Sequence, residues 1–538
     1  MAQNSVTLGQ QVWVGAGASA TMIPEMDIYL YNATCGASPH TTIDDFDLVL
    51  VPDLYVGCTV QIHAADANFS GTAMITANTD TSITVDRAVG DANDEVVDVV
   101  ILGFGAPVPA PTINMRKDTS TASDTSAKPS LLADNWLGLV NTVSPPSVDV
   151  ELGQVSLALA GRNFGYQFKK NETVSGGSLD LSLNSGAWLY YALGKIASIK
   201  HDRTNDNLDG DSTVVTNIDD NQVDTTNCKI LRAISGATYP PVRTNDKANE
   251  NADRAILTGS SWKDITANGD FTYGFGETDG DTLPSFALEI THEKDGLATD
   301  DYYVGSEGDS NEATARPFKD IYSRIFTGCQ VNTYTMNFEE GQEVKANLDL
   351  VSRRAFDSPV NYVPKRNVRS ADGLFNYNGT TESANQPYLF SGGTIEVFGQ
   401  TVARVKSGSF TINNNITPQR FIGNYNRQIT TAHIPGQRTY EVSLNLLVTD
   451  TDIWDNLRAQ GENTTETLTL KFQKSADDVI QIQLNDYIVQ SLDVPFPEDK
   501  GPIEYAMTLS ARSLVQGSLG ASNTGTYYKG KWIIQNND

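Results

Sequence analysis

The sequence predicts a mainly β protein with two tandem domains of the same outline, each with a short helix, and a small N-terminal all-β domain. Alternating apolar and polar residues recur along the 538 residues, separated by segments rich in Asn, Asp, Thr and Ser, which is typical of short strands joined by turns. In addition, one strand-turn-strand outline occurs twice, as CQVNTYTMNFEEGQEVKANLDLVSRR at 329–354 and as YIVQSLDVPFPEDKGPIEYAMTLSARS at 487–513. This repetition indicates a duplicated domain.

The two outlines align along their whole length when one residue is inserted at the turn. In both, an alternating stretch ends in Phe and an acidic residue, a Gly-containing turn follows, and a second alternating stretch ends in Leu, Ser and Arg. The aligned pairs are Val331 with Val489, Phe338 with Phe496, Leu350 with Leu509 and Arg353 with Arg512. The sequence therefore predicts that one pair of strands forms twice.

The N-terminal part divides into three predicted segments. Residues 1–41 are an N-terminal arm, and residues 42–106 contain a compact series of alternations that predicts the small all-β accessory domain. Residues 107–140 are a linker, because the alternate prolines at its start and the polar stretch KDTSTASDTSAKPS can neither continue a sheet nor build a core.

Residues 141–360 are predicted to form the first larger domain. It opens with a hairpin, VDVELGQVSLALAGRNFGYQF, followed by the strand SLDLSL and the helix NSGAWLYYALGK. We expect Asn184 and Ser185 to cap this helix and Gly194 to end it. A stretch rich in Asn, Asp and Thr at about 199–283 has no counterpart in the second domain, and we expect a surface insertion outside the shared sheet.

Residues 361–513 are predicted to form the second domain and repeat this order. GTIEVFG, GSFTINN and YEVSLNLLV are predicted strands, and TDTDIWDNLRAQG is a predicted helix that carries Trp454 and ends at Gly461. We expect Trp454 and Trp188 of the first domain to be core residues. Residues 514–538 are a predicted tail, in which the apolar run KWII either packs on its own domain or adds a strand to a neighbour.

The charge balance restricts the partners of the chain. It has 38 Lys and Arg against 66 Asp and Glu, with a formal net charge of −28 and a pI near 4.5. Such a surface repels a phosphate backbone, which argues against sequence-specific binding of nucleic acid. General solubility and a high-salt or marine source both account for the acidity.

Neither a membrane span nor a secretion signal is recognisable. No stretch approaches the roughly 20 apolar residues of a membrane span, and the N-terminus lacks the basic start and apolar middle of a signal peptide. We expect a soluble, cytosolically made chain without membrane insertion. The cysteines, Cys35, Cys58, Cys228 and Cys329, lack CxxC spacing and are expected to be buried thiols, with a Cys35 to Cys58 disulfide as the alternative.

The sequence lacks the common catalytic and metal-binding patterns. No two of the histidines are close enough for a metal motif, and no GxSxG, phosphate-loop or GxGxxG motif occurs. The segment 205–216 begins like a calcium loop but ends in Thr216 where a bidentate Glu belongs. GETDGD at 276–281 is interpreted as a solvated turn. We therefore predict no catalytic, cofactor-binding or metal-binding residues, no cofactor and no enzymatic activity.

The duplicated unit resembles the tail tube proteins of long-tailed phages and tailed archaeal viruses. The resemblance rests on GRNFGYQFKKNETVSGGSLDLSLNSGAWLYYALGK in the first copy and on the region from FSGGTIEVFG to TDTDIWDNL in the second. It implies a β-sandwich flanked by a helix, with inner sheets that join in a ring around a channel. A chain with two such domains implies pseudo-sixfold rings of three chains, which stack into a tube.

The resemblance also implies partners and a location. The partners are other copies of the chain, a tape-measure protein, tail terminator or baseplate proteins, and passing double-stranded DNA that is not bound sequence-specifically. The location is the virion tail. An acidic channel is expected to keep DNA from adhering, since basic walls would hold phosphates. The accessory domain, the insertion and KWII are expected on the exterior or between rings, with binding of host glycans by the insertion as a second possibility.

Two other functions fit a chain built of repeated β domains. One is a multi-domain β adhesin or carbohydrate-binding surface protein, against which the missing secretion signal argues. The other is the tube component of a contractile injection machine, against which the double copy argues. The sequence does not distinguish a bacterial from an archaeal host, or a contractile from a non-contractile tail.

Overall fold

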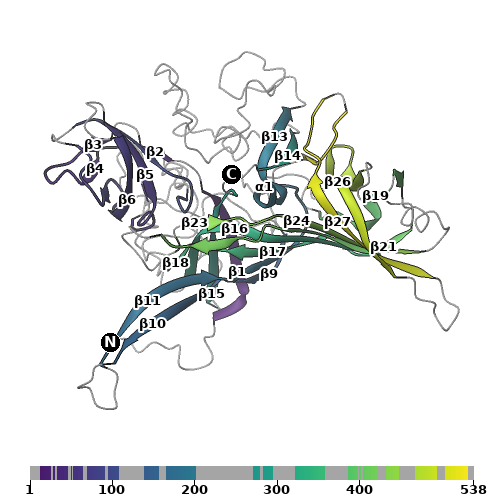
Figure 1. Ribbon diagram of the computed structural model, residues 1–538, viewed down its shortest axis with the longest axis horizontal. Coiled ribbons are helices and arrows are strands. Elements are labelled where there is room, and N and C mark those ends of the chain that lie inside the picture. The colour runs from purple at the N-terminus through teal and green to yellow at the C-terminus, as the bar shows by residue number, and fades with distance from the viewer. Residues whose placement is uncertain are drawn as a thin grey trace.

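The computed structural model confirms a mainly β protein (Figure 1). The structure describes residues 13–25, 28–30, 33–46, 50, 52–64, 70–90, 95–107, 139–156, 165–201, 271–278, 283–294, 321–357, 386–397, 399–401, 404–421, 430, 432–447, 467–493, 503–520 and 522–530. Within these ranges no helix is long and apolar enough to cross a membrane. The predicted helix with Trp454, the segment 205–216 and KWII lie outside the described residues.

The inner layer of the structure is one continuous antiparallel ladder of strands. In spatial order these are β9 (Leu139–Ser144), β12 (Ser178–Ser182), β17 (Lys345–Val351), β16 (Ile321–Glu339), β21 (Val405–Asn413), β24 (Thr439–Leu447), β27 (Glu504–Leu514) and β26 (Asp478–Asp493). Strands of the first predicted domain, β9 to β16, are thus followed by strands of the second without a break. The contact between the two domains is a shared sheet.

An outer layer covers each half of this ladder. Over the first half, β1 (Trp13–Pro24), β15 (Phe286–Lys294), the beginning of β16 and β18 (Arg354–Asp357) pair in that order. Over the second half, β19 (Gly393–Val397), β25 (Leu468–Ser475) and the beginning of β26 pair in the same manner. The long strands β16 and β26 therefore run from the outer layer into the inner one.

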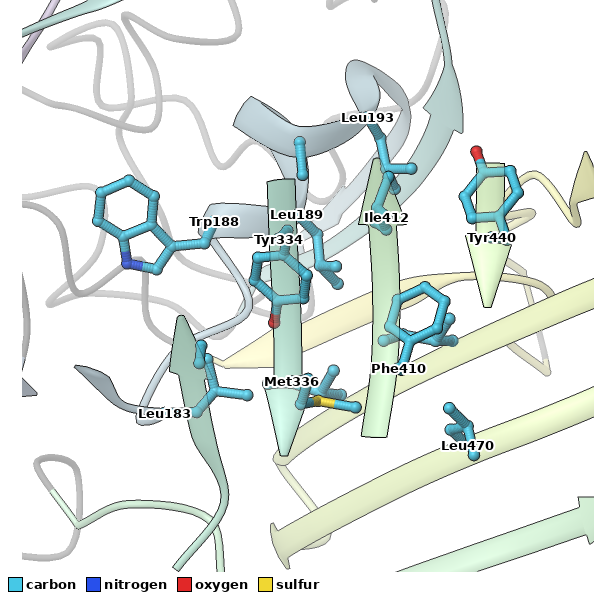
Figure 2. Packing of buried hydrophobic residues seen from close by; sticks show 14 of the residues in the cluster. Leu183, Trp188, Leu189, Leu193, Tyr334, Met336, Phe410, Ile412, Tyr440 and Leu470 are labelled. Carbon is cyan, nitrogen blue, oxygen red and sulfur yellow. The ribbon is translucent and has the colours of Figure 1, made fainter. Parts of the chain in front are cut away.

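The core fills the space between the layers (Figure 2). Tyr334, Met336 and Phe338 alternate along β16 and are fully or almost fully buried, and Phe410 and Ile412 of β21 join them across the boundary between the halves. Because successive strand residues face opposite sides, the residues between them lie on the other face of the ladder. The two halves consequently share one core.

Helix α1 (Trp188–Leu193) packs on this core and ends at Gly194, whose φ of 97° confirms the predicted left-handed end. Trp188 is buried, as expected. The predicted caps are wrong: the helix follows Ala187, and no side chain caps it. Ser185 instead accepts a hydrogen bond from the Ala187 N–H at 3.2 Å in the buried turn before the helix.

The small domain has its own sheet and its own core. Its strands are β2 (Ile28–Leu30), β8 (Val97–Ile101), β5 (Thr59–Ala64), β6 (Ser70–Asn78), β7 (Ile83–Val85), β4 (Thr42–Asp44) and β3 (Thr34–Cys35). Since β2 and β3 belong here and β1 pairs with β15 in the large sheet, the described part of the predicted arm 1–41, which begins at residue 13, is not separate from the two sheets. Strands this short carry too few alternations to be recognised in the sequence. Cys35 and Cys58 are buried thiols, as is Cys329, and this confirms the expectation for these three cysteines.

The ends of the expected insertion differ from the prediction. β13 (Gly194–His201) and β14 (Phe271–Glu277) pair with each other, and β14 pairs with β28 (Tyr527–Gly530), which in turn pairs with β26. These strands belong to the large sheet rather than lying outside it, because the C-terminal strand β28 supplies a hydrogen-bonded partner for β14. Residues 202–270, the bulk of the insertion, lie outside the described residues.

The two halves repeat one another in register. Val331 of β16 lies opposite Leu350 of β17, and Val489 of β26 lies opposite Leu509 of β27, which agrees with the sequence alignment. A register shift follows each valine, between Val331 and Thr333 and between Val489 and Ser491. Two outer pairs also correspond: Phe326 with Leu288, and Leu484 with Leu468. Both halves therefore have the same connections between layers.

Candidate assembly surfaces

The junction between the halves shows how one unit joins the next. Seven consecutive residues of β16, from Thr333 to Glu339, pair with β21, from Asn413 to Ser407. Side chains reinforce the pairing, since Thr335 and Thr411 lie 3.3 Å apart through their hydroxyl oxygens. Asn414, which follows β21, donates to the carbonyls of Val331 and Ala192, each at 3.0 Å. Backbone pairing and a buried amide thus fix the register of the two units.

The face of the ladder opposite the core is mostly polar, with Ile488 of β26 as an exposed apolar residue at its edge. Successive rows across the strands contain Asn337, Ser409, Ser443 and Thr508, and Asp180, Asn347, Thr335, Thr411, Glu441 and Ser510. The charged side chains on this face include the carboxylates of Asp180, Asp349, Glu339 and Glu441 and the cations Lys345 and Arg512. A large sheet face made of hydroxyls, amides and carboxylates is suited to water rather than to a second protein layer.

A groove of about 490 Å³ opens on this face at the turn between β16 and β17. Its lining includes Asn337, Glu339, Gln342, Glu343 and Asn445. Within the described residues no group of three or more His, Cys, Asp or Glu side chains could hold a metal ion. The groove therefore extends the polar, acidic character of the face.

A two-stranded arm projects from the large sheet (Figure 1). It consists of β10 (Ser147–Val155) and β11 (Tyr166–Ser175), which confirms the predicted hairpin. Its apolar side chains are exposed, Leu152 by 59% and Tyr166 by 63%. Tyr166 and Phe168 stack with ring centroids 5.8 Å apart. An apolar surface of this kind on a projecting element indicates a contact with another protein surface.

The base of the arm is attached to the second half of the chain. Arg420, just after β22 (Thr417–Gln419), donates to the hydroxyl of Thr173 at 2.7 Å and to the carbonyl of Glu172 at 3.1 Å. Farther out, Lys170 and Glu151 form an exposed ion pair at 2.6 Å. The arm is therefore held in one direction at its base, while its apolar tip is left exposed.

A buried polar junction joins the small domain to the large sheet. Arg353, 5% exposed, donates to the carbonyls of Gly57, of Phe104 at 3.1 Å and of Thr430 at 3.2 Å. Glu25, at the end of β1, accepts the N–H groups of Gly328 at 2.7 Å and Gly105 at 3.0 Å. These hydrogen bonds connect the small domain with both halves of the large sheet.

Two titratable groups of this junction have shifted pKa values. Burial raises the pKa of Glu25 to about 7, against the opposing effects of its backbone hydrogen bonds and of Arg353. Burial, together with the positive charge of Arg353, lowers the pKa of His433 to about 4. His433 lies edge-on to the ring of Phe104 at 5.0 Å and contacts Gln330 at 3.1 Å. Both groups therefore favour their neutral forms in the folded protein.

The residues considered for chemistry in the sequence have structural contacts where they are described. Glu277 of the GETDGD segment accepts the hydroxyl of Tyr440 at 2.6 Å and the N–H of Leu514 at 2.8 Å. Glu277 thus links β14 to the second half of the sheet and is not part of a solvated turn, while residues 279–281 of this segment lie outside the described residues. The sequence aligned Arg353 with Arg512 but gave no signal that Arg353 is buried at a domain junction.

The chain matches the family described as phage tail tube protein over residues 117–511, which is more than half of its 538 residues. It belongs to the phage tail tube protein family. The chain is accordingly a structural protein of the virion tail, whose copies assemble into a tube. The match begins after the small domain and includes both halves of the ladder.

Two solved structures are similar to this tail tube protein at low identity. One is described as the virion of a native gene transfer agent particle, with 12% identity over 25% of this chain and 96% of that chain, at a TM-score of 0.18. The other is the tail of an empty gene transfer agent particle with C6 symmetry, with 11% identity over 25% of this chain and 93% of that chain, at a TM-score of 0.18. No curated protein matches the chain.

Proposed function

We propose that three copies of this tail tube protein close into a pseudo-sixfold ring, and that stacked rings form the channel through which a long-tailed virus delivers its DNA. Each chain supplies two equivalent units to the ring. The observation that carries this proposal is the pairing of β16 with β21, which joins the two units of one chain edge to edge. A contact of this type that repeats around an axis closes into a ring.

The register of the two units supports one particular pairing of strands between neighbouring chains. In the second unit β26 takes the place of β16, because Val489 and Leu509 pair as Val331 and Leu350 do. In the first unit β9 takes the place of β21, because β9 pairs with β12 as β21 pairs with β24. These two strands end the ladder of a single chain. We expect β26 of one chain to pair with β9 of the next.

Closure gives the terminal strands hydrogen-bonded partners and removes two edges at which chains could aggregate. Two units in each of three chains give the six positions that the family resemblance implies. The polar face then lines the channel, and the shared core and outer layer form the wall. The carboxylates of Asp180, Asp349, Glu339 and Glu441 repel the phosphates of passing DNA, and they outnumber the cations Lys345 and Arg512 on that face.

The projecting arm supplies a contact between successive rings. Its exposed apolar residues, with Leu152 and Tyr166 foremost, are covered when the tip rests on a neighbouring copy. Because Arg420 fixes the base of the arm, its tip is directed before assembly. This lowers the ordering cost of the contact. During assembly a tape-measure protein occupies the channel, and tail terminator or baseplate proteins cap the ends of the tube.

Electron microscopy of the purified protein, combined with native mass measurement, tests this function. We expect tubes, or rings of three chains with a central channel as wide as double-stranded DNA. A Glu340→Pro variant is the informative partner, because proline removes the N–H of Glu340 that donates to the carbonyl of Lys406 across the junction between the units at 2.8 Å. Monomers alone, over a range of salt and protein concentrations, would contradict ring formation and favour the adhesin alternative.

A further inference from the structure

We propose that the small domain stands on the outer wall of the tube, once per chain, and that the tube works without a closely fitting contractile sheath. The proposal rests on the function proposed above, since it requires the polar face to line the channel. It goes beyond that function by assigning the outer surface of the tube. In Figure 1 the small domain is seen at the upper left of the large sheet and the projecting arm at the lower left.

The outer layer of the first unit is buried on both faces. Phe286 and Leu288 of β15 and Phe326 of β16 point into the core that the two layers share. Ala287 and Ile325, which alternate with them, belong instead to the core of the small domain. Because neighbouring strand residues face opposite sides, the small domain covers the surface of the outer layer that faces away from the polar face.

The attachment is rigid because it combines apolar and polar contacts. Phe356 of β18 packs against the small-domain core beside Ile325. Arg354 donates to the carbonyl of Val56 at 3.0 Å, next to the carbonyls that Arg353 contacts. A buried guanidinium that satisfies several carbonyls at once holds two domains in a fixed orientation. The small domain is thus part of the wall rather than a module on a free linker.

The corresponding surface of the second unit is not built to hold such a domain. By register, Gln483 of β26 takes the place of Ile325, and it pairs with Thr469 as Ile325 pairs with Glu289. Gln483 accepts the N–H of Gly525 at 3.0 Å, and its own N–H donates to the hydroxyl of Thr526 at 3.1 Å. The C-terminal segment thus covers this surface with polar contacts. The outer wall therefore has threefold and not sixfold symmetry.

A domain placed in this way conflicts with a sheath. The subunits of a contractile sheath enclose a tube closely and shift along it during contraction. Three rigid domains per ring, repeated at every level of the tube, would stand in the path of that movement. This outer surface therefore fits a tail in which no sheath encloses the tube.

Labelling of cysteines in assembled tubes tests the position of the domain. Thr81 lies in an exposed turn of the small domain, and Asn445 is exposed on the polar face. In a Cys228→Ser background, we expect a bulky maleimide-polyethylene glycol to label Thr81→Cys equally in tubes and in unassembled chains. Asn445→Cys should react in unassembled chains and be protected in tubes at least tenfold. The parent without either substitution measures reaction of the native thiols.

The outcomes separate this inference from the proposed function. Tubes in which Thr81→Cys is protected, or in which Asn445→Cys reacts fully, would overturn the outward position of the small domain while leaving tube formation intact. Failure of the parent to form tubes would remove the proposed function and the inference with it. Cryo-electron microscopy of the virion completes the test: three densities per ring on an exposed tube support the proposal, and a protein layer enclosing them overturns it.

Discussion

Gly328 and Asp486 occupy the same position in the two halves of the sheet, and both have a left-handed backbone, with φ of 62° and 52°. Each lies three residues before the matched valines Val331 and Val489, at the point where its long strand passes from the outer to the inner layer. A left-handed residue in a strand bends it locally. The repeated bend, which the sequence does not reveal, is an independent indication that the halves share one origin.

The bend at Gly328 leaves no room for a side chain. A Cβ atom at Gly328 would lie 2.5 Å from Cβ of Arg353 and 3.2 Å from the ring of Phe104. We expect Gly328→Ala to lower the free energy of unfolding by about 3 kcal/mol, through backbone strain and overpacking together. Gly341→Ala is the matched control, since its φ is 76° but no atom lies within 4 Å of the added Cβ, and about 1 kcal/mol is expected. Denaturant unfolding of the unassembled chains measures both, and equal losses would contradict the crowding.

Much of the inner ladder could be predicted from the sequence, and the layers could not. The alternation of Tyr334, Met336 and Phe338 identifies a buried strand face, and the repeated outline identifies its duplicate. Alternation does not say which strand lies beside which. The pairing of β16 with β21, which joins residues far apart in the chain, is therefore visible only in the structure. The same holds for β1, whose partner β15 follows the whole small domain in sequence.

Some features of the assembly surfaces could be predicted from the sequence, and others could not. The hairpin that forms the projecting arm was recognisable from its alternation, but its exposure was not, since alternation with apolar residues usually marks a buried face. Arg353 and Arg512 look equivalent in the aligned outlines. Only the structure shows that the first is buried against carbonyls of the small domain and the second is exposed.

The two arginines are therefore expected to differ in their contribution to stability. Arg353→Met removes the donor for three backbone carbonyls and leaves them buried. We expect it to lower the free energy of unfolding by about 3 kcal/mol or more. Arg512→Met changes an exposed side chain and should alter it by about 0.5 kcal/mol or less. Thermal unfolding of the two variants, side by side, measures the difference, and a similar loss in both would refute the role of Arg353 in docking.

The junction also predicts opposite effects of pH from two residues. The pKa of Glu25 is raised from 4.5 to about 7 on folding, so its contribution to stability is complete below pH 4.5 and is lost as the pH rises through 7. The pKa of His433 is lowered from 6.5 to about 4, so its contribution is complete above pH 6.5 and is lost as the pH falls through 4. Between pH 4.5 and 6.5 the two effects cancel.

When one of the two residues is replaced, the free energy of unfolding should change with pH as the remaining residue dictates. Glu25→Gln lacks the carboxyl group whose ionisation destabilises the parent as the pH rises. The free energy of unfolding of this variant minus that of the parent should therefore increase by about 1.4 kcal/mol per pH unit between pH 4.5 and 6.5. His433→Gln should show a difference of the opposite sign. A constant loss of stability is superimposed on each profile, because Gln at position 25 places an N–H group against the N–H of Gly105 or Gly328, and Gln at position 433 loses the ring contact with Phe104. Parallel pH profiles for all three proteins would contradict these assignments.

The projecting arm should be needed for tubes but not for rings. In a variant with Leu152→Ser and Tyr166→Ser the exposed apolar surface is removed, while the buried core and the pairing between β16 and β21 are untouched. We expect rings of three chains that do not elongate at concentrations at least tenfold above those at which the parent forms tubes. Val96→Ser, at a similarly exposed apolar residue of the small domain, serves as the control and should elongate normally. Normal tubes from the arm variant would exclude the arm as the contact between rings.

The acidic face should determine how DNA behaves in the channel. Asp349→Lys and Glu441→Lys, combined, reverse two charges per chain on that face, which amounts to twelve units of charge in a ring of three chains. Each added lysine that meets a phosphate releases a counterion, so retained DNA should fall steeply as salt is raised. We expect tubes of the variant to retain short duplex DNA at low salt, and virions that carry it to eject their DNA more slowly. Asp80→Lys together with Asp45→Lys, in the small domain, changes the net charge equally and controls for attraction to the tube exterior. If ejection and retention are the same for the face variant, the parent and the control, then the carboxylates of the face do not line the path of the DNA.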